Sequence, residues 1–372
     1  MRNVFIIFIV LLLSYGCEKQ ASSCFSPGTS WFDNNGQLIN AHGGNIIFHN
    51  NRYYWYGENI EDSIQNNSFG INCYSSTDLY NWKKEAISFT PPKEQENTLK
   101  QGSDILYPKV IYNERTKNFV MWFQVDSRNK SSRTSRTGVA VSKTATGPFQ
   151  FIYSYRPNAG SLPLNLPYPP DSILKAEDYV LNSPAWMEAV NKGLYAYRDM
   201  KKGQTSYNMT LFVDNNLQAY HIYSSEDELA IHIAELYDDY LSHTGKYVRI
   251  PTDGYNETIA FFRRNDKYFL ITSVSNMDGK YQLKLYHADN IMGKWSLYSD
   301  FYNKENSNDF LSNLQNSFVF PVNGKKDAYI FIGDYWQQQN PDKSYYVWLP
   351  ILFKNDEPYT QWQDKWDLSF FD

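Results

Sequence analysis

Residues 42–59, HGGNIIFHNNRYYWYGEN, carry the pattern that the rest of the chain repeats. The apolar run Ile46 to Phe48 is followed by Asn50 and Asn51, and then by a Tyr/Trp-rich run that ends at Glu58. Asparagine tolerates the left-handed backbone that tight hairpins require, and aromatic residues favour strands. The stretch therefore predicts two antiparallel strands joined by a short turn.

Four further copies of this pattern follow along the chain, without a long amphipathic helix between them. They begin with YPKVIYNERTKNFVMWFQVD (107–126), NMTLFVDNNLQAYHIY (208–223), ETIAFFRRNDKYFLITSVS (257–275) and NSFVFPVNGKKDAYIFIGDYW (316–336). Short strands repeated about every 50 to 65 residues are typical of a propeller. The sequence predicts an all-β fold, a five-bladed β-propeller, over residues 31–372. Residues 156–204 lack this periodicity and predict an insertion between blades two and three, folded over one face.

The propeller geometry predicts where the functional residues meet. The first strand of every blade lines the central axis, so the start of each copy would deliver a side chain to one shared cavity. The residues at these starts are His42, Leu106–Tyr107, Asn208, Glu257 and Gln315.

The N-terminus resembles an export signal rather than a folded element. Arg2 precedes the apolar run Val4 to Leu13, which is too short to span a bilayer but suits a signal peptide. The stretch LSYGC ending at Cys17 resembles a bacterial lipobox, so we expect a signal peptide over 1–16, lipidation of Cys17 and a tether over 17–30. The alternative is an ordinary signal peptide with an incidental cysteine. The expected location is the cell envelope of a bacterium, lipid-anchored in the periplasm or on the outer-membrane surface. Cys24 and Cys73 could pair there, but nothing in the sequence indicates that they do.

Composition excludes several function classes. The net charge of −5 argues against a nucleic-acid binder, which would show clustered Lys and Arg. Aromatic residues make up 17% of the chain, with 31 Tyr, and their half-apolar faces suit sugar rings as well as strands. The sequence contains no HExxH, no GxSxG, no phosphate loop and no paired His/Cys spacing. We therefore expect no cofactor and no metal, and a polysaccharide or oligosaccharide as the partner.

Several stretches resemble glycoside hydrolase family 43, in particular the branch that contains exo-β-1,3-galactanases and related arabinogalactan-degrading enzymes. They include AHGGNIIFHNNRYYWYGE, YSSTDLYNW, GVAVSKTATGPF, HIYSSEDELAIHIAEL, DDYLSHTGKYVRI and YVWLPI, in order from about residue 36 to 353. The resemblance implies an exo-acting and inverting glycosidase on galactan or arabinogalactan side chains. A calcium ion occurs in the channel of some family members, but no residue of this chain indicates one.

The resemblance also assigns catalytic roles. Glu257 matches the general acid, and Gln315 matches a glutamine that helps to orient the attacking water. In a Tyr-rich cavity the Glu257 carboxyl would be partly desolvated, which favours its protonated form. The alternative for Glu257 is a hydrogen bond to a neighbouring blade. The carboxylate that usually tunes the acid is replaced by Asn208, and the blade-two pattern ERPK is replaced by Leu106-Tyr107-Pro108-Lys109.

Other residues are candidates for substrate contacts. We expect Glu58, Glu226 and Asp334 to bind sugar hydroxyls, although each could be a solvated loop acid. The remaining candidates are His42, Tyr107, Asn208 and the stacking platforms Trp336 and Trp55, and the two tryptophans could instead be blade core.

The departures from the family predict a cavity that is less charged and more aromatic. Asp104, two residues before Leu106, could replace a lost carboxylate if its loop bends inward. The two functions that remain open are a glycosidase with Glu257 as the acid, and a lipid-anchored glycan-binding propeller without useful turnover.

Overall fold

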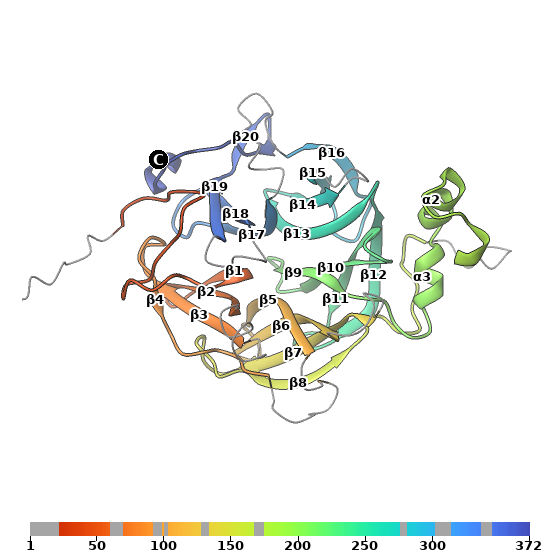
Figure 1. Cartoon of the computed structure of the whole chain (residues 1–372), viewed down its shortest axis with the longest axis horizontal. Helices are drawn as coiled ribbons and strands as arrows, with labels where there is room; N and C mark the ends of the chain where they lie inside the picture. Colours follow the sequence, from red (N-terminus) through yellow and green to blue (C-terminus); the bar gives the residue numbers. More distant parts are fainter. Residues whose placement is uncertain are drawn as a thin grey trace, which may run out of the picture.

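The computed structural model describes residues 22–59, 70–91, 99, 103–127, 134–166, 175–275, 281–301, 314–335 and 344–372. Five antiparallel sheets of three or four strands surround one axis (Figure 1). This arrangement confirms the predicted five-bladed β-propeller. The signal peptide and Cys17 lie outside the described residues.

Each blade is a meander whose strands follow one another outward from the axis. Blade one contains β1 (His42–His49), β2 (Arg52–Asn59), β3 (Gly70–Ser76) and β4 (Lys83–Lys84). Blade two contains β5 (Ser103–Asn113), β6 (Asn118–Ser127), β7 (Arg136–Ser142) and β8 (Gln150–Tyr155). Blade three contains β9 (Tyr207–Val213), β10 (Ala219–Ser225), β11 (Ala230–Leu236) and β12 (His243–Pro251). Blade four contains β13 (Tyr255–Arg264), β14 (Lys267–Ser275), β15 (Tyr281–Ala288) and β16 (Ser296–Asp300), and blade five β17 (Gln315–Pro321), β18 (Tyr329–Tyr335) and β19 (Tyr345–Pro350).

The hairpin predicted at residues 42–59 forms as β1 and β2. His49 pairs with Arg52, so Asn50 and Asn51 are the two central turn residues. Both have positive φ, 49° and 60°. Two left-handed residues define the turn whose twist matches the twist of the flanking strands.

The first described residues and the C-terminal segment meet between blades five and one. Thr29 pairs with Tyr346 of β19, and Phe25 pairs with Trp366, which precedes the short helix η6 (Leu368–Phe371). The hairpin of β20 (Leu352–Lys354) and β21 (Glu357–Tyr359) follows blade five. The first strands of the blades contact one another in turn, and β17 contacts β1. The N-terminal segment therefore helps to close the ring.

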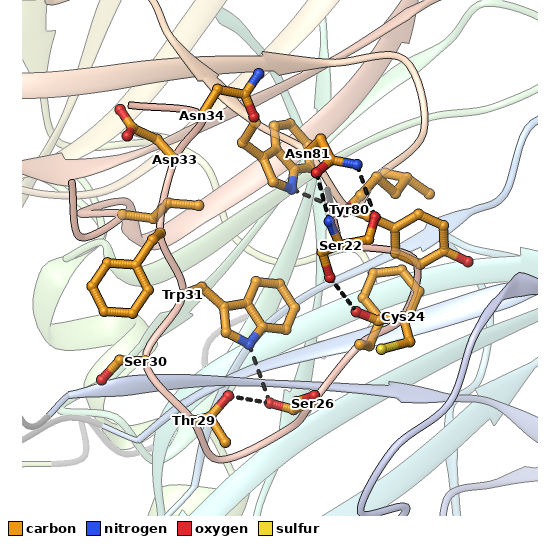
Figure 2. Close-up of a pocket in the computed structure, with 15 residues that line it drawn as sticks. Ser22, Cys24, Ser26, Thr29, Ser30, Trp31, Asp33, Asn34, Tyr80 and Asn81 are labelled. Atoms are coloured by element: carbon orange, nitrogen blue, oxygen red, sulfur yellow. Dashed lines mark hydrogen bonds between the residues drawn. The ribbon is translucent and has the colours of Figure 1, made fainter. Parts of the chain in front are cut away.

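The beginning of the described chain is held on blade one. The Ser22 amide donates to Asn81 Oδ1 at 2.9 Å, and Asn81 Nδ2 donates back to the Ser22 carbonyl at 2.9 Å (Figure 2). A hollow lies between this segment and residues 79–82. Cys24 and Cys73 are both free thiols, and Cys73 is buried.

Aromatic residues fill the space between blades one and five. Trp55, Trp82 and Trp348 are each at most 2% exposed. The ring of Trp55 lies 5.3 Å from that of Trp82 and 5.0 Å from that of Trp348. Rings of this size contribute much apolar area to a core, and edge-to-face contacts add to the stability. Trp55 is therefore core and not a stacking platform for substrate.

The insertion between blades two and three contains η2 (Ala176–Asp178), α2 (Pro184–Asn191) and α3 (Leu194–Asp199). The Ser183 hydroxyl caps α2, and Gly193 with φ of 93° separates α2 from α3. Both helices lie at the rim beside β12 (Figure 1). The described helices of the insertion thus lie at the edge of blade three, where their core also contacts Tyr255 of blade four, and the expected cover over one face stays a prediction. No helix of the described residues is long and apolar enough to cross a membrane.

Candidate active site

The first strand of each blade is irregular where the repeats predict functional residues. The pairing register shifts between His42 and Asn45, between Leu106 and Lys109, and between Asn316 and Phe318. It also skips Asn208 in β9 and Glu257 in β13. A bulge interrupts the alternation of a strand and re-aims a side chain, and bulges concentrate next to active sites. All five blades therefore present a bulge on the strand nearest the axis.

Carboxylates from two blades surround Gly43 in β1. The Gly43 amide donates to Asp334 Oδ2 at 2.7 Å, and the Lys109 ammonium donates to the Gly43 carbonyl. Glu58 Oε1 accepts from the Tyr107 amide at 2.7 Å. Gly43 has φ of 63°, and a Cβ atom there would lie 2.6 Å from Glu58 Oε1. Only glycine therefore fits the centre of this acidic cluster.

Lys109 is the cation of this cluster. It is 0% exposed, whereas Glu58 is 9% and Asp334 5% exposed. Burial raises the pKa of Glu58 and of Asp334 and lowers the pKa of Lys109, because charged groups are costly away from water. The attraction between Lys109 and the two carboxylates opposes each of these shifts. Three buried ionisable groups therefore lie on this side of the axis, and the expectation of a less charged cavity stays a prediction.

His42 belongs to the same cluster but does not carry a charge there. Its ring is stacked on Tyr346 at 4.7 Å, and its Nδ1 lies 3.9 Å from Asp334 Oδ1. Burial lowers the pKa of His42 to about 3. At neutral pH the imidazole is therefore neutral and can only share hydrogen bonds.

Tyr107, which stands where the family pattern has Arg, connects the two sides of the axis. Burial raises its pKa well above the usual range. Carboxylates from all four other blades add to this shift: Glu58 of blade one, Glu228 of blade three, Glu257 of blade four and Asp334 of blade five. Acids from four blades therefore act on this one hydroxyl, and among these four acids Glu257 is the one that lies at a predicted blade start.

A second group of polar residues surrounds Asn208. The Asn208 amide donates to Gln124 Oε1 at 2.8 Å, and Gln124 Nε2 donates to Asp126 Oδ2 at 2.7 Å. Asn208 Nδ2 donates to the carbonyl of Asn256 at 3.3 Å, directly before Glu257. Burial, with Asp104 nearby, raises the pKa of Asp126. Asp104 pairs with Asp126 between β5 and β6 and so lies in this group.

Glu226 is placed apart from the other candidates. It is 0% exposed, accepts from Arg249 Nη2 at 2.7 Å and shares a 2.8 Å hydrogen bond with His232. Although burial opposes ionisation, Arg249 and His232 hold the pKa of Glu226 low, at about 2. Arg249 also donates to the carbonyls of Val190 and Asn191 in the insertion. The contacts of Glu226 thus join blade three to α2.

The side chains of two candidates, Gln315 and Trp336, lie outside the described part of the structure. The backbone of Gln315 pairs with Asp334, which puts it at the start of blade five, but its side chain is outside the described part. Trp336 also lies outside the described residues. Leu106 is half-buried in β5, where its backbone pairs with Gln124.

Sequence reasoning missed Lys109 and Glu228. The available signal for Lys109 was its position inside an apolar strand. A lysine inside such a run is rarely buried unless a partner pairs with it. Glu228 is the last acid of SSEDE, and local sequence does not separate it from a solvated loop acid. Among the described residues, no group of three or more His, Cys, Asp or Glu is arranged to hold a metal ion.

Comparisons with known proteins agree with the fold. The sequence profile of glycosyl hydrolases family 43 matches residues 177–346. A family 43 β-1,3-galactosidase solved with galactodeoxynojirimycin is 39% identical, with 92% of this chain and 100% of that chain covered and a TM-score of 0.84. A second family 43 β-1,3-galactosidase is 31% identical, with 95% and 65% covered and a TM-score of 0.76. An exo-β-1,3-galactanase from Clostridium thermocellum is 28% identical, with 92% and 66% covered and a TM-score of 0.70.

A search of curated protein sequences found no match. The similarity to the first galactosidase extends over nearly the whole of both chains, and its identity is far above what a shared fold alone requires. The chain belongs to glycoside hydrolase family 43.

Proposed function

We propose that this glycoside hydrolase releases galactose from the ends of β-1,3-linked galactan or arabinogalactan side chains, with inversion at the anomeric carbon. The observation that carries the proposal is the pair of buried acids, Glu58 and Asp334, which accept hydrogen bonds from the first strands of blades two and one, in a chain that is 39% identical to a family 43 β-1,3-galactosidase. Two of the similar proteins described above are named β-1,3-galactosidases, and the third is named an exo-β-1,3-galactanase. Galactan is therefore the first substrate to test.

Glu257 is the proposed general acid. It occupies the bulge of β13 and is half-buried, so its carboxyl is not confined to the regular alternation of the strand. In the proposed step, the glycosidic C1–O bond breaks as Glu257 gives its proton to the leaving oxygen and a water oxygen bonds to C1. The proton that this water loses returns to Glu257 through solvent before the next turnover. General acid catalysis of this kind typically contributes 10²–10⁴-fold to the rate.

The remaining candidates receive roles around the sugar. Gln315, at the start of blade five, is the proposed partner of the attacking water. Glu58, Asp334 and His42 are proposed to bind hydroxyls of the terminal sugar, because carboxylates and a neutral imidazole can accept hydrogen bonds from them. Tyr107 and Asn208 complete this set, as does Trp336 by stacking. Glu226 stays a weaker candidate because Arg249 and His232 already occupy its carboxylate.

The decisive experiment is release of reducing sugar from β-1,3-galactan, arabinogalactan and arabinan by wild type, Glu257→Gln and the control Glu235→Gln. Glu235 pairs at 3.3 Å with the surface residue Lys246, so its loss should leave activity unchanged. Glu257→Gln should lose at least about 100-fold in kcat while binding is kept. ¹H NMR of the first product identifies the anomer and tests inversion.

Three outcomes would count against the proposal. Equal activity of wild type and Glu257→Gln would remove Glu257 from the mechanism. Release of internal fragments instead of monosaccharide would contradict exo action. Retained galactan binding without turnover by wild type would favour the glycan-binding propeller.

We also propose that the protein is exported and held in the envelope by a lipid on Cys17. Ser22 is already fastened to blade one, so a tether that ends there would place the ring close to the membrane. Metabolic labelling with palmitate in a bacterial host tests this proposal. The label should be absent from Cys17→Ser, and an unlabelled wild type that is secreted in soluble form would contradict the anchor.

A further inference from the structure

The loop between β10 and β11 carries three acids in an unusual backbone conformation. Glu226, Asp227 and Glu228 all have positive φ, at 56°, 57° and 68°. Residues with a side chain rarely adopt this conformation, and three in succession persist only where surrounding contacts hold them.

The first two acids supply those contacts. Glu226 is bound by Arg249 and His232. Asp227 accepts from Arg198 of α3 at 2.8 and 2.7 Å. Two arginines, one from β12 and one from the insertion, therefore clamp the loop and fix the direction of the third acid.

The backbone of Glu228 is hydrogen-bonded to the residue before the candidate acid. Its carbonyl accepts from the backbone amide of Asn256 at 2.8 Å and from Asn256 Nδ2 at 2.9 Å. Asn256 directly precedes Glu257, so the loop of blade three is joined to the bulge of blade four at this point. The Asn208 side chain reaches the carbonyl of the same Asn256.

The Glu228 carboxylate is half-buried, and three acids contribute negative charge to its surroundings. They are Glu257, Asp126 and Asp227, and they add to the effect of burial in raising the pKa of Glu228 to about 7. Glu228 in turn adds to the rise in the pKa of Tyr107 and of Tyr207. A solvated loop acid would not have this environment.

We propose that Glu228 is the charge partner of Glu257, because the loop that carries Glu228 is hydrogen-bonded to Asn256, directly before Glu257. In the resembling branch a carboxylate is expected at position 208, where this chain has an amide. Asn208 and Glu228 both bind Asn256, so Glu228 supplies from the β10–β11 loop the charge that β9 lacks. Glu228 acts through Glu257 and is therefore a positioning residue. This role rests on the proposed function, in which Glu257 is the acid.

The first test follows the titration of the carboxyl groups and does not depend on turnover. The full chain is labelled with ¹³C-glutamate, and the side-chain carboxyl resonances are followed from pH 4 to 9. Wild type should show a resonance with a midpoint near pH 7 in addition to that of Glu58, whose pKa burial raises to about 8, and Glu228→Gln should remove only the resonance near pH 7. In Glu257→Gln the midpoint should move to lower pH, because a neighbouring negative charge is removed. A midpoint unchanged by Glu257→Gln would overturn the proposal.

The second test measures kcat/KM on β-1,3-galactan against pH. Loss of the partner charge in Glu228→Gln should move the alkaline limb of the kcat/KM profile to lower pH by about 1 unit or more. At pH 7 this shift corresponds to a kcat/KM that is about tenfold lower than that of wild type. Glu228→Asp should restore part of the shift, and Glu235→Gln should match wild type. An unchanged limb in Glu228→Gln would overturn the proposal. A wild type inactive on every galactan would contradict the proposed function instead, and the carboxyl titration would still decide whether the pair exists.

Discussion

Replacement of Lys109 by methionine would test how the acidic cluster around Gly43 is stabilised. Lys109 is fully buried, donates to the Gly43 carbonyl and is attracted by Glu58 and Asp334. Methionine has a similar volume, so the change removes the charge and the hydrogen bond while leaving little empty space. Removing one partner of a buried ion pair typically costs about 3 to 5 kcal/mol, because the remaining charge is left uncompensated.

The cost should depend on pH. Burial holds the pKa of Glu58 and Asp334 above their ordinary values, so the folded chain binds more protons than the unfolded chain between about pH 4 and 8. This part of the stability is present at low pH and falls as the pH rises through that range. Lys109 lowers the pKa of Glu58 and of Asp334, so both values rise further without it. The free energy of unfolding of Lys109→Met should therefore fall more steeply with pH than that of wild type. At pH 5 both carboxyls are protonated, and Lys109 is a buried cation without a charged partner. Its removal at pH 5 should therefore cost no more than about 1 kcal/mol for the lost hydrogen bond.

The assay is urea unfolding of wild type and Lys109→Met at pH 5 and pH 8, followed by tryptophan fluorescence. Lys83→Met is the matched control, because Lys83 is 63% exposed and pairs with Glu85 at the surface. We expect the control to change the free energy of unfolding by less than about 0.5 kcal/mol. Equal stability of wild type and Lys109→Met at pH 8, or the same deficit at both pH values, would refute the reasoning.

Two further substitutions probe the site and its supports. Gly43→Ala should lower stability by about 1 to 2 kcal/mol from its left-handed backbone and should also reduce kcat/KM, because the new Cβ atom displaces Glu58. Gly36 is the matched control, because it has φ of 78° and no atom lies within 4 Å of a Cβ added there. In thermal melting Gly36→Ala should show the backbone cost alone, and its galactose release should match wild type. Arg249→Met should cost about 3 to 5 kcal/mol at pH 7, because Glu226 is left buried without a cation. Since the pKa of Glu226 is held low, this stabilisation is lost as pH falls from about 4.5 to 2. Urea unfolding at pH 7 and pH 3 measures it; a deficit no larger than that of the surface variant Arg115→Met would contradict the role of Arg249.

The sequence alone determined the strands, their turns and the five-fold repetition. Asn50 and Asn51 adopt the left-handed turn that their residue types favour, and the five starts at His42, Leu106–Tyr107, Asn208, Glu257 and Gln315 all lie on first strands. These features depend on neighbouring residues only, through alternation and turn preference, so a local pattern is sufficient to predict them.

Only the tertiary structure decided which charges meet. Gly43 and Asp334 are 291 positions apart and touch because the ring closes. Bulges in β5 and β13 free Tyr107 and Glu257 from strand alternation, and the clamped loop brings Glu228 beside the bulge of another blade. Periodicity predicts which face of a strand a residue occupies, but a bulge cancels that periodicity at the positions where the blades converge. The partners of Lys109 and Glu228 depend on that convergence, so no pattern along the chain could identify them.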